Sequence, residues 1–210
     1  PGRRGSRAAA HREPRRGFLH RFDRRCGIVR RVLLGDLLDV NLLSVHVQTG
    51  LVSVRAHTSD PSLVVYNYTH ECQYARAWDD VTRQCRGLIV RYGPVNPGAA
   101  EVVARPWPKF YNYGEHEEGA LTLAGEVEVS DKLDGSLGIL YPVREGQWAI
   151  ATRGSFDSEQ ALYGSRIWRD SYSHIEPEPG WTFLFEIIYS GNRIVVDYGD
   201  LDDLVLLGAV

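Results

Sequence analysis

The spacing of apolar residues predicts three helical stretches along the chain. The first is followed by Gly50, a residue type that commonly ends helices. Thr69 is placed to cap the second helix, and either Asp157 or Ser158 lies near the start of the third. We expect these helices at residues 33–48, 69–78 and 156–172.

Between these helices, apolar and polar residues alternate in short runs that are typical of strands. The turn at 59–61 and the Gly- and Pro-rich loop at 93–98 separate strand pairs. Many antiparallel strands with few helices predict an α+β domain. The expected strands are 51–56, 63–68, 86–92, 101–105, 126–132, 138–143, 148–153, 182–188, 193–197 and 204–210.

The composition narrows the class of protein. No window approaches the roughly 18 to 20 uninterrupted apolar residues that a membrane-spanning helix needs, and no secretory signal follows the basic N-terminus. Cys26, Cys72 and Cys85 are odd in number and form no CxxC pair, which argues against a disulfide scaffold and a zinc site. We therefore expect a cytoplasmic protein that does not enter a membrane.

Charge divides the chain into two parts. Residues 1–31 contain eleven Arg against Glu13 and Asp23, a net charge of +9, whereas residues 32–210 carry −12. Such a tail could attach to nucleic acid electrostatically, but it also resembles unstructured, low-complexity translated sequence. We expect residues 1–31 to be a basic, disordered tail and assign it no function; the folded domain is expected at 32–210.

Lysine is scarce in this chain. Of 24 basic residues only Lys109 and Lys132 are lysines. Arginine stays protonated, whereas a lysine amine can act as a nucleophile when its pKa is lowered. Scarcity therefore indicates that these two positions are candidates for chemistry that needs an amine.

Lys132 begins the sequence KLDGS at 132–136. An amine held before such a turn could attack the α-phosphate of a nucleoside triphosphate and expel pyrophosphate, with a metal ion offsetting phosphate charge. The motif is weak alone, because Asp-Gly is a common hairpin turn and a lysine before it is usually solvated.

The neighbouring motifs make the interpretation of KLDGS more specific. CRGLIV at 85–90, RPWPKFYNYGE at 105–115, KLDGS at 132–136, ATRGS at 151–155 and FLFE at 183–186 occur in order. Together they resemble the phage-type RNA ligase 1 family of ATP-dependent covalent nucleotidyltransferases, over roughly residue 33 to the end. The resemblance implies an antiparallel-sheet nucleotidyltransferase (ATP-grasp-like) fold, with ATP and Mg²⁺ as cofactors and RNA as the partner.

The resemblance also implies roles for the KLDGS residues. Lys132 would become the lysyl-AMP, and Asp134, Gly135 and Ser136 would surround the nucleotide. Glu186 would contact the ribose hydroxyls or, with Asp134, position a hydrated Mg²⁺. From the residues alone, Glu186 could instead be an ordinary surface residue of an alternating strand.

Two arginines are expected to bind phosphate. Arg86 matches the family's upstream arginine, and Arg153 lies where viral members often carry lysine; a guanidinium suits either position through bidentate hydrogen bonds. The alternative for Arg86 is an ion pair with Asp79 or Asp80.

The segment 105–115 is rich in aromatic residues. Trp107, Phe110, Tyr111 and Tyr113 could stack on bases, but aromatic residues between prolines more often pack in a core, which we expect here. The role of Lys109 is left open.

Two later family elements, a strand glutamate and a lysine-containing strand, do not occur within the 210 residues. We therefore expect an adenylation domain that is incomplete at its C-terminus and labels itself weakly or not at all. The expected activity is ATP-dependent sealing of 5′-phosphate and 3′-hydroxyl RNA ends, with a broken tRNA or another RNA as substrate. A DNA ligase or capping-type enzyme and a catalytically inert nucleotide- or RNA-binding remnant are the alternatives.

Overall fold

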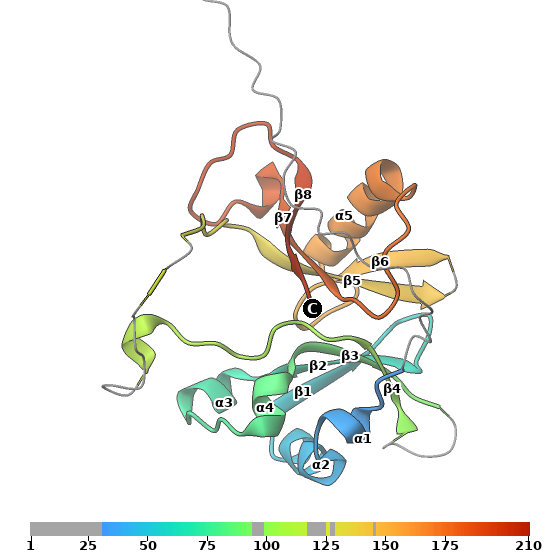
Figure 1. Cartoon of the computed structure of the whole chain (residues 1–210), viewed down its shortest axis with the longest axis vertical. Helices are drawn as coiled ribbons and strands as arrows, with labels where there is room; N and C mark the ends of the chain where they lie inside the picture. Colours follow the sequence, from blue (N-terminus) through green and yellow to red (C-terminus); the bar gives the residue numbers. More distant parts are fainter. Residues whose placement is uncertain (1–30, 94–98, 117–124, 127–128, 145) are drawn as a thin grey trace, which may run out of the picture.

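The structure is a computed structural model that describes residues 31–93, 99–116, 125–126, 129–144 and 146–210. Within these residues the chain forms two four-stranded antiparallel sheets (Figure 1). We call them the N-terminal sheet, with order β1-β2-β3-β4, and the C-terminal sheet, with order β6-β5-β7-β8. The strands are β1 (Val52–Ala56), β2 (Leu63–Tyr68), β3 (Arg86–Arg91), β4 (Glu101–Ala104), β5 (Ser136–Arg144), β6 (Gln147–Ala151), β7 (Phe183–Ile188) and β8 (Asp203–Ala209).

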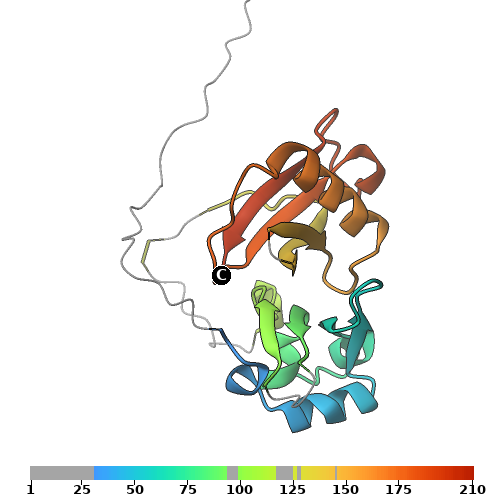
Figure 2. The same ribbon diagram turned by 90° about the vertical axis from the view of Figure 1, so that its right-hand side faces the viewer.

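The expected α+β architecture is confirmed, and the helices lie outside the two sheets (Figure 2). None of the helices in the described ranges is long and apolar enough to cross a membrane. The helices are α1 (Leu34–Leu37), α2 (Val40–Gln48), α3 (His70–Tyr74), α4 (Asp80–Gln84) and α5 (Glu159–Ile167), with 3₁₀ turns at Tyr113–Glu115 and Ser190–Asn192 and a π-helical turn at Trp168–Tyr172.

Helix caps explain where the predicted helices start and stop. Thr69 accepts a hydrogen bond from the N–H of Cys72 and Ser158 from that of Ala161, which confirms both caps. The single helix expected at 33–48 is divided, because Asp39 caps a new helix, α2. The helix expected to run to residue 78 ends at Tyr74, and α4 follows with its own capping box.

Two predicted strands are wrong. Residues 129–132 of the expected strand 126–132 form no strand, and residues 127–128 lie outside the described residues. Val129 is 89% exposed, so this segment has no core to face. Residues 193–197 also form no strand, because the N–H groups of Val195 and Val196 donate to a carboxylate instead of a neighbouring strand. The other predicted strands are present, with ends shifted by a few residues.

Side-chain alternation along the strands produces a layered core. On β2, Leu63 and Val65 face the C-terminal sheet, whereas Val64 and Tyr66 face the helices α1, α2 and α4. The C-terminal sheet packs in the same way against α5 and the π-helical turn. The layer between the two sheets is built from Leu63, Val65, Ile89, Ala104, Ile139, Tyr141, Ala151, Phe156 and Leu184.

At Gly87, β3 lies close against the C-terminal sheet. The φ of Gly87 is +88°, and a Cβ added there would lie 2.4 Å from Ile139 Cδ1 and 3.2 Å from Arg153 Cα. Only glycine suits this position, because a side chain would be strained and would also push the sheets apart. The contact brings β3 against the residues that follow β6.

Candidate functional site

The turn 132–136 lies against β7 and leads directly into β5. The N–H of Gly135 donates a 2.8 Å hydrogen bond to Glu186 Oε1. Ser136 Oγ donates to Asn192 Oδ1 at 3.0 Å, and the Asn192 amide in turn donates to the Ile187 carbonyl. These bonds fix the backbone just after Lys132, whose own residue is exposed.

Gly135 is required for this close packing. A Cβ on Gly135 would lie 2.5 Å from the Ile187 carbonyl oxygen and 3.2 Å from Glu186 Cγ. The first of these is a backbone atom within a sheet and cannot move aside easily. Gly135 therefore has a steric role, because it lets the turn rest on β7, and its expected place around the nucleotide stays a prediction.

Asp134 ties the turn to the loop after β7. Its Oδ2 accepts hydrogen bonds from the N–H groups of Val195 (2.6 Å) and Val196 (2.8 Å), and its own N–H donates to Tyr198 Oη. The backbone hydrogen bonds from Val196 and Val195 lower the pKa of Asp134, so the carboxylate is held ionised. No sequence pattern predicted this contact between Asp134 and the loop.

Glu186 is half-buried on β7 rather than an ordinary surface residue. Burial raises the pKa of its carboxyl group, and the hydrogen bond from Gly135 together with the positive charge of Lys132 opposes that rise. Lys132 also lowers the pKa of Asp134. The lysine amine, Asp134 and Glu186 thus interact electrostatically at one end of the C-terminal sheet.

Arg86 and Arg153 come from different sheets and meet around Tyr68. Arg153 Nη1 donates to Tyr68 Oη at 3.0 Å, and its guanidinium lies 5.1 Å from the Tyr68 ring centroid. Burial lowers the pKa of Arg86, Tyr68 opposes this, and the positive charge of Arg153 adds to the lowering. Two guanidinium groups held close together concentrate positive charge and hydrogen-bond donors, and this combination is suited to binding a phosphate group.

The alternative expected for Arg86 is wrong. Asp79 caps α4 and pairs with His46 at 2.6 Å, and Asp80 pairs with Arg83. Arg86 instead donates to the Trp107 carbonyl at 3.4 Å.

A cavity of about 450 Å³ opens between the sheets, and three of the predicted site residues line it. Arg86 reaches it from β3, Ser136 from β5 and Arg153 from the turn after β6. Asn67 was missed, although it is a polar residue in an otherwise apolar strand; its Oδ1 is buried, and no hydrogen-bond partner for it is found in the described residues. The lining residues are Asn67, Arg86, Ser136, Leu137, Thr152, Arg153, Gly154, Ser158 and Gln160.

Sequence comparison identifies the family. Residues 84–210 match the family described as RNA ligase, which is more than half of the chain. The chain belongs to the RNA ligase family. All seven predicted site residues fall within the matched range.

A relative of this RNA ligase family member is a protein of Thermovibrio ammonificans named "Putative RNA ligase". The two are 33% identical over 132 residues, which cover 59% of this chain and 33% of the relative. The aligned part thus spans about a third of the relative's length.

In this RNA ligase family member the two lysines occupy unlike surroundings. Lys109 Nζ lies 5.5 Å from the Trp78 ring centroid and 4.5 Å from that of Tyr111, and it pairs with Glu115 at 3.9 Å. Its side chain is 13% exposed. Lys109 therefore stabilises the aromatic segment, whereas Lys132 is exposed at the start of the turn 132–136.

The core packing expected for the aromatic segment is only partly right. Trp107 packs against the layer between the sheets, and Tyr111 contacts Trp78. Phe110 and Tyr113, however, are 61% and 71% exposed.

Asp134 and Glu186 are the carboxylates expected to position Mg²⁺ in this RNA ligase family member, and their surroundings can be compared with what a Mg²⁺ site needs. Within the described residues, no three His, Cys, Asp or Glu side chains converge to form a metal site. Asp134 and Glu186 each use one oxygen, Oδ2 and Oε1, to accept backbone N–H groups. Mg²⁺ is commonly held by one or two carboxylates together with water and substrate phosphates. The two residues fit such a site, and their assignment to Mg²⁺ stays a prediction.

Proposed function

We propose that this chain is the adenylation part of an ATP-dependent RNA ligase with a nucleotidyltransferase fold. In this proposal Lys132 accepts AMP from ATP, and the activated AMP is used to join a 5′-phosphate to a 3′-hydroxyl of RNA. The proposal rests on one observation above all. In a member of the RNA ligase family, two guanidinium groups and Ser136 converge in a cavity that adjoins the turn carrying Lys132.

The first step makes direct use of these residues. The Lys132 amine attacks the α-phosphorus of ATP; a nitrogen–phosphorus bond forms, the bond to the pyrophosphate oxygen breaks, and the amine loses a proton. Arg86 and Arg153 would bind phosphate oxygens through charge-assisted hydrogen bonds. Mg²⁺, held near Asp134 and Glu186, would supply further positive charge to the phosphates. Positioning and charge stabilisation are the main sources of rate in such transfers.

The later steps consume the stored AMP. The RNA 5′-phosphate oxygen attacks the phosphorus of lysyl-AMP, which frees Lys132 and forms a 5′,5′-diphosphate bridge. A 3′-hydroxyl then attacks the RNA phosphorus, a phosphodiester forms, and AMP leaves. Each step exchanges one bond at phosphorus, so the same arginines can act throughout.

The scarcity of lysine makes the first step easy to test. The chain is incubated with α-labelled ATP and Mg²⁺, and the label is assigned by peptide mapping to Lys109 or Lys132, the two lysines present. Any label that forms should be on Lys132 and should be absent from Lys132→Ala. The amount of label also tests the expectation that the 210-residue chain labels itself weakly or not at all.

Other outcomes would redirect the proposal. Binding of ATP or RNA without any labelled lysine would support a catalytically inert remnant. A preference for GTP would favour a capping-type enzyme, and sealing of nicked duplex DNA would favour a DNA ligase. Joining of 5′-phosphorylated RNA, tested on this chain and on any longer protein from the same reading frame, would support the ligase.

A further inference from the structure

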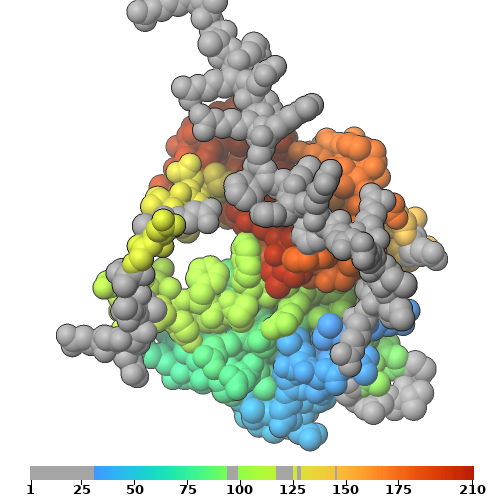
Figure 3. All heavy atoms as spheres, in the orientation of Figure 1, coloured from blue at the N-terminus to red at the C-terminus, as the bar shows by residue number. Residues whose placement is uncertain are grey.

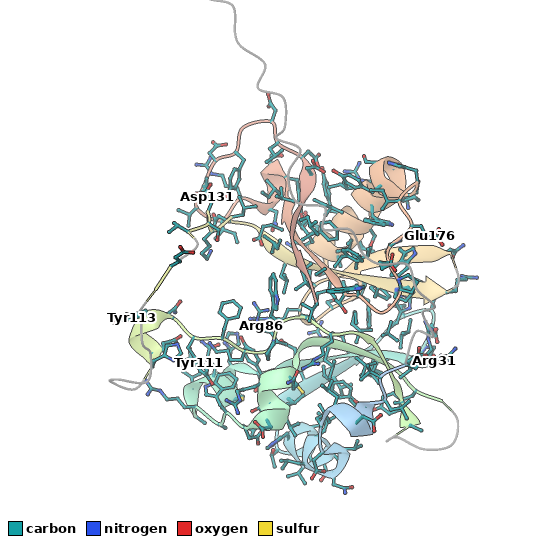
Figure 4. The ribbon with its side chains drawn as sticks, in the orientation of Figure 1. Arg31, Arg86, Tyr111, Tyr113, Asp131 and Glu176 are labelled. Carbon is teal, nitrogen blue, oxygen red and sulfur yellow. The ribbon has the colours of Figure 1, made fainter. Side chains whose placement is uncertain are left out.

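The segment after β4 carries two exposed aromatic rings, and one of them, Phe110, contacts Arg86. Phe110 is 61% exposed and Tyr113 is 71% exposed. They belong to the segment after β4, which forms one side of an opening seen in the space-filling view (Figure 3). In the stick view, Arg86 and Tyr113 lie on one side of this opening and Asp131, next to Lys132, lies on the other (Figure 4).

Phe110 is joined to the cavity through Arg86. The Arg86 guanidinium carbon lies 4.8 Å from the Phe110 ring centroid, and Arg86 also lines the cavity of about 450 Å³. One face of the ring is thus engaged by a cation, while most of the side chain is left open to solvent. In this pair, Arg86 offers its charge to a phosphate and Phe110 offers its free ring face to a neighbouring group.

The exposure of these rings is selective. In the same segment, Trp107 is packed into the core and Tyr111 is packed against Trp78. A single exposed aromatic residue would need no explanation, but Phe110 contacts an arginine that lines the cavity, and a second exposed ring, Tyr113, follows three residues later. Exposed aromatic rings beside cationic side chains are the usual means by which proteins bind unpaired nucleotides.

We infer that Phe110, in the same exposed segment as Tyr113, is a stacking site for an unpaired base of the RNA substrate, next to the phosphate site of Arg86 and Arg153. The inference builds on the proposed RNA ligase function and adds a subsite for single-stranded RNA. The adenine of ATP fits less well, because small cofactors are normally enclosed in concave pockets, whereas Phe110 stands on an open surface. Stacking tolerates any base, so the site would recognise unpaired RNA rather than a sequence.

RNA binding without ATP tests this site directly. The probe is a short, 5′-phosphorylated single-stranded RNA labelled at its 3′ end, and its affinity is measured by fluorescence anisotropy on the 210-residue chain. Phe110→Leu keeps an apolar side chain but removes the aromatic face. We expect it to weaken binding by roughly tenfold or more, while Phe110→Trp binds at least as well as the wild type. Affinity for ATP should fall much less than affinity for RNA in Phe110→Leu, because Phe110 contacts Arg86 and is not itself expected to touch ATP.

Two controls separate stacking from general effects. Tyr74 is 84% exposed on α3, so Tyr74→Leu removes an exposed ring elsewhere and should leave RNA affinity unchanged. Arg153→Gln should reduce the salt dependence of binding, because it removes a phosphate contact, whereas Phe110→Leu should lower affinity with the same salt dependence. Thermal unfolding checks that each variant is folded.

An abasic scan gives the decisive measurement. One nucleotide of the RNA at a time is replaced by an abasic residue. At one position, this replacement should weaken binding to the wild type by about as much as the Phe110→Leu substitution weakens binding to intact RNA. At that same position, the abasic residue should cause no further loss of affinity in Phe110→Leu. The inference would be overturned if abasic residues caused equal losses in the wild type and in Phe110→Leu at every position. It would also be overturned if Phe110→Leu bound RNA with full affinity, or if that substitution weakened ATP binding and left RNA binding unchanged. These readouts need no lysyl-AMP, so the labelling of Lys132 can fail while the stacking site stands, or the reverse.

Discussion

The N–H of Gly135 donates a 2.8 Å hydrogen bond to Glu186 Oε1, and this bond holds the turn after Lys132 against β7. Because Gly135 has no room for a Cβ, the turn and the strand can be this close only with glycine. The carboxylate that is expected to serve the nucleotide or metal is therefore also a structural partner of the turn that carries the nucleophile.

Replacing Glu186 separates these two roles. Glu186→Ala should destabilise the protein by about 1 kcal/mol, because a partly buried N–H loses its acceptor. Glu186→Gln keeps an acceptor oxygen and removes a charge that burial disfavours, so its stability at pH 7 should equal or exceed that of the wild type. Both variants should lose labelling of Lys132. Urea unfolding measures stability, with Glu176→Ala as the control at an exposed site; a Gln variant as unstable as Ala would contradict the structural role.

Asp134 should make the loop after β7 sensitive to acid. Its pKa is lowered below 3.8 in the folded state, so its stabilising effect is present above that pH and is lost as the pH falls through the folded pKa. Asp134→Asn should therefore be less stable than the wild type at pH 7, and the difference should shrink below about pH 4. Urea unfolding at several pH values measures this, and amide exchange at Val195 and Val196 should be faster in the variant at pH 7. Asp131→Asn, the same change at an exposed neighbour, should show no such dependence.

The arginine after β6 should determine nucleotide affinity. Arg153→Ala should weaken ATP binding by roughly tenfold or more, because a charged hydrogen-bond donor to phosphate is lost. Arg153→Lys should keep most of the affinity, since lysine also binds phosphate. Titration calorimetry in a Lys132→Ala background measures binding without reaction. Arg166→Ala, at an exposed position on α5, is the control and should bind ATP normally; an equal loss there would indicate a general charge effect.

Local sequence signals predicted most of the fold. Alternation of apolar residues identified the strands that bury a face, and the caps at Thr69 and Ser158 were readable from residue type. One failure lies where contacts distant in sequence decide the backbone. The strand expected at 193–197 was wrong because its N–H groups donate to Asp134, about sixty residues away.

The site shows the same division. The motif resemblance gave Arg86, Ser136 and Arg153, which the fold brings to one cavity. It could not give Asn67, because nothing in a single sequence links β2 to the turn after β6. The sequence also could not show which rings of the aromatic segment are buried. Phe110 and Trp107 are both aromatic residues beside a proline or lysine, yet Trp107 packs in the core and Phe110 is exposed.

Gly87 offers a test of how tightly the two halves of the site are joined. A Cβ at Gly87 would meet Ile139 Cδ1 at 2.4 Å and Arg153 Cα at 3.2 Å, and its φ of +88° disfavours any side chain. Gly87→Ala should therefore cost about 2 kcal/mol or more of unfolding free energy and weaken ATP binding by displacing Arg153. Gly146→Ala has a similar backbone strain, φ +70°, in open space and should cost about 1 kcal/mol. Gly114→Ala, with neither constraint, should be nearly neutral. If Gly87→Ala cost no more than Gly146→Ala and bound ATP normally, the close contact between the sheets would not determine the geometry of the cavity.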